Sequence, residues 1–227
     1  MAKKQSRLLL IVAVVVIVGI LLALVIFLGT QSAQGLTPGV KAGDEFIYNI
    51  SGSYVSTDSS AVVPETFYQA NMTEWYKVTV TDVNGTKVSI NTKWRFENGT
   101  ELDITGYVKI ESGEVFPSNG FWPIYASNLK VDDIVRPSRG QLTVNDTNTK
   151  EYASGITRET NSVSWTEELY DRDDPTGSTT LNKVTIIQFD RETGMLVQLT
   201  DISIYNNPQL TLTTTWKLIE SNVWTVS

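Results

Sequence analysis

The feature that most constrains the fold is a strict alternation of apolar and polar side chains between Val88 and Phe96. Successive side chains of a β-strand point to opposite faces, so this period of two predicts a strand with one apolar face and one polar, basic face. Asn84-Gly85 precedes the segment and Asn98-Gly99 follows it, and both dipeptides are typical of tight hairpin turns. The region is therefore predicted to be part of an antiparallel meander.

The same alternation recurs along most of the chain. It predicts further strands at 44–55, 74–82, 102–110, 155–170, 183–189, 195–205 and 210–219. A turn is expected over 190–194, and only one short helical turn is expected, near 127–135. The predicted fold class is all-β. Strands of this length favour one large curved antiparallel sheet, a half-barrel or open barrel, and a two-sheet sandwich is the alternative.

Residues 8–28 form an uninterrupted apolar run, LLLIVAVVVIVGILLALVIFL. A helix of this length crosses roughly 30 Å of hydrocarbon, and the run is longer than the apolar core of about 7 to 15 residues in a cleaved signal peptide. We therefore expect one retained N-terminal transmembrane helix. The resulting division is a cytoplasmic N-terminus at 1–7, the helix at 8–28, a Gly- and Pro-containing linker at 29–43 and an extracytoplasmic β domain at 44–227.

The distribution of charge sets the expected orientation and partners. Three basic residues, Lys3, Lys4 and Arg7, precede the apolar run, which places the N-terminus in the cytoplasm and the C-terminal domain on the other side of the cell membrane. Without those three, 15 basic residues face 25 acidic ones, a net charge of −10. Such a surface repels nucleic acid, so the expected partners are the lipid bilayer, through 8–28, and a ligand or another envelope protein.

The absence of cysteine and histidine excludes several classes of site. Disulfides, thiolate nucleophiles, imidazole metal ligands and histidine-assisted triads are all impossible in this chain. Carboxylate chemistry remains, but the adjacent Glu167 and Glu168 lie on one predicted strand and so point to opposite faces. We expect no catalytic activity and no catalytic residues, and a carboxylate-dependent hydrolase is the less favoured alternative.

Two kinds of polar site are candidates for ion or glycan attachment. Asp171, Asp173 and Asp174 offer oxygen ligands for calcium in one loop, but their spacing is not that of an EF-hand, and no other cofactor is expected. Five asparagines stand in Asn-x-Ser/Thr sequons and are candidate glycosylation sites in an exported chain: Asn49, Asn71, Asn84, Asn98 and Asn145.

Aromatic residues are the remaining candidates for recognition. Because Trp94 and Trp216 lie on alternating apolar faces, we interpret them as core residues. A second group of aromatics lies near Pro117 and Pro123 and is expected in a loop. Exposed aromatic side chains in a loop indicate a contact surface. We therefore expect ligand or partner contacts from Phe121, Trp122, Ile124 and Tyr125.

Three short segments carry a resemblance to known proteins. They are GVKAGDEFIY at 39–48, NLKVDDIV at 128–135 and FDRETGMLV at 189–197. They resemble segments of uncharacterised archaeal membrane-anchored β-rich surface proteins, and the last is also similar to hairpins in lipoprotein-carrier (LolA-like) half-barrels. The resemblance implies an archaeal surface protein with a curved sheet and supplies no catalytic residues. VKAGD at 40–44 and LKVDD at 129–133 are similar to each other, and we interpret both as ordinary turns that precede strands.

These observations lead to two hypotheses about function. The first is a membrane-anchored extracytoplasmic binding domain, non-catalytic, that holds an apolar ligand or an envelope protein partner. The alternative is a structural or accessory subunit of the cell-envelope coat.

Overall fold

The chain folds around one long antiparallel β-sheet in a computed structural model that describes residues 35–117, 123–136, 142–153, 155–170 and 180–226. Its elements are β1 (Glu45–Ser56), α2 (Glu65–Asn71), β2 (Thr73–Asn84), β3 (Lys87–Phe96), β4 (Glu101–Lys109), β5 (Glu114–Phe116), β6 (Asp146–Glu151), β7 (Thr157–Tyr170), β8 (Thr180–Asp190), β9 (Leu196–Asn206) and β10 (Gln209–Ser221). All eight strands expected from the alternation are confirmed, with their ends shifted by a few residues.

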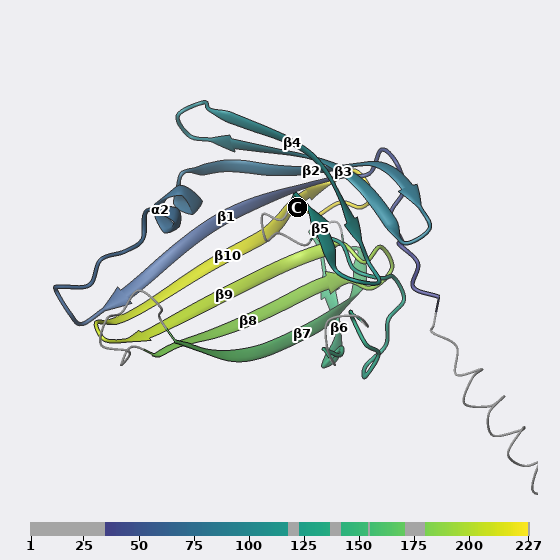
Figure 1. Cartoon of the computed structure of the whole chain (residues 1–227). Coiled ribbons are helices and arrows are strands. Elements are labelled where there is room, and N and C mark those ends of the chain that lie inside the picture. Colours follow the sequence, from purple (N-terminus) through teal and green to yellow (C-terminus); the bar gives the residue numbers. More distant parts are fainter. Residues whose placement is uncertain (1–34, 118–122, 137–141, 154, 171–179, 227) are drawn as a thin grey trace, which may run out of the picture. The chain divides into compact units, whose positions relative to one another are not determined.

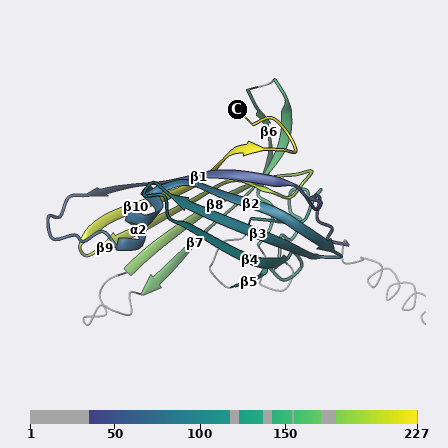
Figure 2. The ribbon, with the colours of Figure 1, turned by 90° about the horizontal axis from the view of Figure 1, so that it is seen from above.

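The strands form a single open sheet in the order β5-β4-β3-β2-β1-β10-β9-β8-β7-β6. Two five-stranded meanders, β1 to β5 and β6 to β10, are joined in the middle by antiparallel pairing of β1 with β10. All the described strands belong to this one sheet, so the two-sheet sandwich does not occur. The sheet is strongly curved, and β2, β3 and β4 arch over one side of strands β7 to β10 (Figures 1 and 2).

The core lies on the concave face of the sheet near the start of β1. Phe46 and Tyr48 are fully buried there, and the Tyr48 hydroxyl donates a hydrogen bond of 2.8 Å to the Leu196 carbonyl. Residues 123–125 cover this face by pairing with 194–196, through bonds such as Tyr125 N to Gly194 O at 2.8 Å. The Tyr125 ring then stacks on Phe189 with 4.6 Å between ring centroids, which seals this end of the sheet.

The helix α2 and the strands β5 and β6 were not predicted. The helix begins after Pro64, whose fixed φ is tolerated at a helix start, and buries Phe67 and Ala70 on one face. Phe67 packs with Leu210 and Leu212 of β10 in a small apolar cluster. The helical turn expected near 127–135 is replaced by two tight turns.

The tight turns predicted at glycines are confirmed by their backbone. Gly85, Gly99 and Gly194 have φ of 59°, 81° and 73°, values that favour glycine. At Gly194 a side chain is also excluded by space, because a Cβ there would lie 2.1 Å from the Tyr125 carbonyl oxygen. A substitution at this position would therefore separate 123–125 from the hairpin that it covers.

The two similar segments, VKAGD and LKVDD, form the same turn. Asp44 Oδ2 accepts a bond of 2.9 Å from Lys41 N, and Asp133 Oδ2 accepts one of 2.8 Å from Lys130 N. Gly43 and Asp132 occupy the same position with φ of 91° and 70°. Each turn comes before one of the five-stranded meanders. The third strands of the two meanders also contain similar sequences, KVSI at 87–90 in β3 and KVTI at 183–186 in β8.

The predicted transmembrane segment at 8–28 lies outside the described residues. Among the residues that are described, no helix has the length and hydropathy needed to cross a bilayer.

Candidate ligand-binding groove

A groove of about 320 Å³ opens on the concave face of the sheet, away from the buried end. Its floor is formed by strands of both meanders and carries both apolar and polar side chains. The floor residues are Ile50, Lys183, Asp201, Ser203, Thr214 and Trp216. The rim is formed by Trp94 on β3 and by Tyr205 and Leu212 on β9 and β10.

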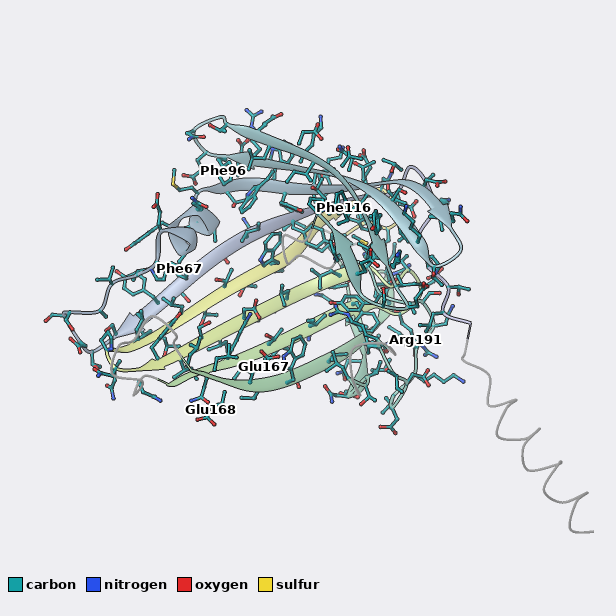
Figure 3. The ribbon with its side chains drawn as sticks, in the orientation of Figure 1. Phe67, Phe96, Phe116, Glu167, Glu168 and Arg191 are labelled. Atoms are coloured by element: carbon teal, nitrogen blue, oxygen red, sulfur yellow. The ribbon has the colours of Figure 1, made fainter. Side chains whose placement is uncertain are left out.

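The helix α2 forms one wall of the groove. Pro64, Phe67 and Ala70 line this wall (Phe67 is labelled in Figure 3), and the Phe67 ring lies close to Gly52 of β1. A Cβ at Gly52 would lie 2.7 Å from the tip of the Phe67 ring. The absence of a side chain at Gly52 therefore allows the helix to sit close to the sheet. Beside it, the Asn71 carboxamide oxygen accepts a hydrogen bond from Gly52 N and ties the end of the helix to β1.

The pairing register divides the concave floor into four rows that run across β7, β8, β9, β10 and β1. Two rows are mostly apolar: Val163, Ile187, Leu199, Trp216 and Ile50 form the one nearer the core, and Leu169, Leu181, Tyr205, Leu210 and Ser56 form the one at the open end. Between them lies what we call the polar band, whose members are Thr185, Asp201 and Thr214 in one row and Glu167, Lys183 and Ser203 in the next.

The charges of the polar band are linked by short contacts but stay accessible to solvent. Lys183 Nζ lies 3.6 Å from Asp201 Oδ2, with 35% and 31% of the two side chains exposed. The buried Thr185 hydroxyl donates a bond of 2.6 Å to the other oxygen of Asp201. Glu167 is opposite Lys183 in the register and accepts a bond of 3.0 Å from the Trp165 indole. The band therefore presents fixed donors and acceptors to whatever enters the groove.

An aromatic cluster forms the end of the groove that is nearer the core. Trp94 and Trp216 are only partly buried, and the Tyr76 ring lies 5.8 Å and 5.0 Å from their rings in edge-on contacts. Burial raises the pKa of Tyr76, so its phenol keeps its proton to a higher pH than an exposed tyrosine does. The interpretation of both tryptophans as pure core residues was incomplete, because each also borders the groove.

A second hollow, of about 400 Å³, lies beside the turn at 190–194 and is strongly charged. Its charges are already paired within the protein. Arg158 forms ion pairs with Asp190 at 2.6 Å and Glu192 at 2.9 Å, and Arg191 pairs with Glu159. The Arg158 guanidinium also lies over the Trp224 ring, 4.5 Å from its centroid. We interpret this hollow as a structural ion-pair network.

The predicted contact segment divides into two parts. Phe121 and Trp122 lie outside the described residues. Ile124 and Tyr125 are 2% and 3% exposed and pack in the core, Ile124 in a β-bridge with Met195 and Tyr125 against Phe189. Because both side chains are buried, neither offers exposed surface for recognition.

The predicted calcium ligands Asp171, Asp173 and Asp174 also lie outside the described residues. Within the part of the chain that is described, no group of three acidic side chains is arranged to hold a metal ion. Glu167 and Glu168 point to opposite faces of β7, as the alternation predicts, and Figure 3 shows Glu167 over the concave side and Glu168 outside.

All five sequon asparagines are exposed in the structure. Asn49 lies on β1, Asn71 ends α2, Asn84 and Asn98 lie at hairpin turns, and Asn145 precedes β6. The side-chain oxygen of Asn145 accepts a bond of 2.6 Å from Ser164 N.

No protein-family model matches the chain, and no curated protein matches it.

Proposed function

We propose that this chain is a single-pass membrane protein whose extracytoplasmic β domain binds a ligand in the concave groove and catalyses no reaction. The observation that carries the proposal is the groove itself. It combines an accessible volume of about 320 Å³ with aromatic edges and a band of fixed donors and acceptors. Concave sites with a mostly apolar lining and a few convergent polar groups are typical of ligand binding.

The part of the proposal that concerns the membrane rests on the sequence. The apolar run at 8–28 and the three basic residues before it favour a helix with a cytoplasmic N-terminus. The exposure of all five sequon asparagines is compatible with glycosylation outside the cytoplasm. The resemblance to archaeal surface proteins and to carrier half-barrels belongs to the same proposal.

A binding role is favoured over catalysis by the groove's own contacts. Asp201 is engaged by both Lys183 and Thr185, and Lys183 stands between Asp201 and Glu167. A glycosidase needs two carboxyl groups that flank the scissile bond, about 5 to 9 Å apart, with room between them for the substrate. Lys183 separates Glu167 from Asp201 in the register, and with no histidine or cysteine the chain has no other recognisable nucleophile and base.

The test uses full-length protein purified from its native membrane under mild conditions. Its mass is recorded intact and again after denaturing extraction. We expect a small molecule that is released on denaturation at close to one per chain. The variant Thr214→Trp should lose it, because the new indole fills the groove floor. The matched control Thr213→Trp points to the opposite face of β10 and should retain it. A bare wild-type chain would contradict the proposal.

A structural role in the cell-envelope coat is the second candidate, and a partly exposed apolar patch on the convex face favours it. Val184 and Ile202 lie side by side there by register, and Ile204 is 36% exposed next to them. Surface apolar patches often mark contacts between proteins. Cross-linking in native membranes that yields regular oligomers, together with lysine substitutions at Ile202 and Ile204 that abolish them, would support this candidate over the first.

A further inference from the structure

We propose that the ligand of the groove is a neutral saccharide chain that lies across strands β7 to β10 along the polar band. This inference rests on the proposed binding function and narrows it to one chemical class. It follows from the order of the rows on the floor, from the aromatic residues beside them and from the sign of the charge.

The rows on the floor match the chemistry of a sugar chain. A pyranose ring has hydroxyl groups around its edge, each of which donates and accepts a hydrogen bond, and apolar C–H groups on its faces. The polar band supplies acceptors at Glu167 and Asp201, a donor at Lys183 and hydroxyls at Ser203 and Thr214. The apolar rows on both sides confine the polar contacts to the polar band. A saccharide that lies along the band can place its hydroxyl groups over these polar side chains.

Aromatic rings stand where sugar faces would pack. Trp165 lies at the β7 end of the polar band, and its indole is held in place by the bond of 3.0 Å to Glu167. At the other end of the band lies Tyr54 of β1, which is 53% exposed and pairs in the register with Leu212 of β10. Trp216 borders the band from the row nearer the core. Flat aromatic surfaces next to carboxylates provide both kinds of contact that a saccharide makes.

The width of the floor sets the expected length of the ligand. Neighbouring strands lie about 4.8 Å apart, so the distance from β7 to β10 is roughly 14 Å, about the length of three pyranose rings. A saccharide of this length or longer reaches from Trp165 to Thr214 and contacts each member of the band. A monosaccharide reaches only part of it.

An acyl chain fits the floor less well. It would cover Lys183 and Asp201, whose side chains are about one third exposed, and replace their water with groups that form no hydrogen bonds. Burial of charged groups without new polar partners is costly. An anionic ligand is disfavoured as well, because the polar band has two carboxylates for one lysine and the chain after residue 7 has a net charge of −10.

The test measures binding of the full chain to an array of neutral glycans, with palmitate in vesicle-free solution as the competing probe. The protein is kept in a polyoxyethylene detergent, because alkyl glycoside detergents carry the chemistry under test. We expect saturable binding of neutral oligosaccharides of three or more rings and no displacement by palmitate. Glu167→Gln should weaken this binding by roughly tenfold, the value of one charge-assisted hydrogen bond. Glu168→Gln, one residue along on the opposite face, is the matched control and should bind as the wild type does.

The outcomes separate the failure of the ligand class from the failure of the proposed function. Stoichiometric binding of palmitate with no glycan bound would overturn the saccharide and leave ligand binding in the groove intact. Glycan binding that is lost in Glu168→Gln and kept in Glu167→Gln would place the site on the convex face and overturn both. A native chain without any released molecule that also binds neither probe would overturn both as well.

Discussion

At the scale of single residues, Asp190 is a buried carboxylate that accepts four hydrogen bonds. Its carboxylate is fully buried and accepts bonds of 2.6 Å and 2.9 Å from Arg158. It also accepts bonds of 2.8 Å and 2.7 Å from the backbone N–H and hydroxyl of Thr193. The same side chain therefore holds the turn at 190–194 and neutralises a guanidinium that is largely buried.

Replacement of Asp190 by alanine should lower the free energy of unfolding by about 3–5 kcal/mol, because it removes the buried partner of the Arg158 charge and leaves only the exposed Glu192. The measurement is urea unfolding of the full chain in mild detergent, followed by tryptophan fluorescence. Asp103→Ala is the control, since its pair with Lys93 is 3.6 Å long and roughly half exposed. Such surface pairs contribute about 0–1 kcal/mol. Equal losses in the two variants would show that the Asp190 network does not stabilise the fold.

Tyr152 makes the free energy of unfolding depend on pH in alkaline solution. Burial, followed by the charge of Asp190, raises its pKa from 10.0 to about 12. Between these two values the unfolded chain loses the phenol proton while the folded chain keeps it. The unfolded state then binds fewer protons, so stability falls as pH rises from about 10 to about 12.

The variant Tyr152→Phe should flatten this fall. The measurement is the free energy of unfolding of both proteins at about pH 9, 10, 11 and 12, a series that spans the pKa of the unfolded and of the folded state. Tyr54→Phe is a suitable control because Tyr54 is 53% exposed. Wild type and Tyr152→Phe with parallel pH curves would contradict the prediction. Other buried phenols, Tyr48 and Tyr125, have pKa values raised by burial and should leave a residual slope in the variant.

At the scale of elements, the strands were predictable and the small elements were not. A strand buried on one face must alternate, and that pattern is visible in β1, β3 and β10 without any knowledge of their neighbours. The edge strand β6 has the sequence DTNTKE and has no apolar face, so no periodicity distinguishes it from a loop. The helix α2 has only seven residues, too few for a helical period to be detected.

The groove was not predictable for a different reason. Lys183, Asp201 and Glu167 are far apart in sequence, and each looks like an ordinary strand residue. They converge because the register pairs Glu167 on β7 with Lys183 on β8 and places Asp201 on β9 in the neighbouring row. A shift of one residue in any of these strands would move its side chains to the convex face. Register depends on contacts across the whole sheet, which local pattern does not contain.

The position of α2 depends on Gly52, which gives a prediction at the scale of this element. In Gly52→Ala the new Cβ would lie 2.7 Å from the tip of the Phe67 ring, so the ring must shift, and we expect the helix that carries it to move away from β1. We expect a loss of about 1–3 kcal/mol, the usual cost of overpacking. Hydrogen exchange at 65–71 should also become faster. Ser51→Ala, one residue earlier and exposed on the other face, should change neither quantity. Unchanged exchange at 65–71 in Gly52→Ala would contradict this account of the groove wall.

At the scale of the whole molecule, the first and last strands meet in the middle of the sheet. β1 pairs with β10 along most of its length, so the two meanders are held together by residues about 160 positions apart in the chain. Contacts this distant in sequence have a large loop-closure cost and form slowly. The pairing of β1 with β10 is therefore the contact that makes one sheet of two similar halves.

A disulfide across this pairing tests the topology directly, because the chain has no cysteine of its own. Ser53 and Thr213 are register partners on the convex face, so the double variant Ser53→Cys/Thr213→Cys should form an intramolecular disulfide on oxidation. The bond should raise the free energy of unfolding by up to roughly 5 kcal/mol, the loop-entropy limit for a loop of about 160 residues.

In the control Ser53→Cys/Thr214→Cys the two side chains point to opposite faces. Because cysteines whose Cβ atoms point apart cannot be bridged without backbone movement, this control should stay reduced. Efficient bridging in the control and none in the register pair would mean that the sheet is not joined in this register, and the four rows of the groove floor would have to be redrawn.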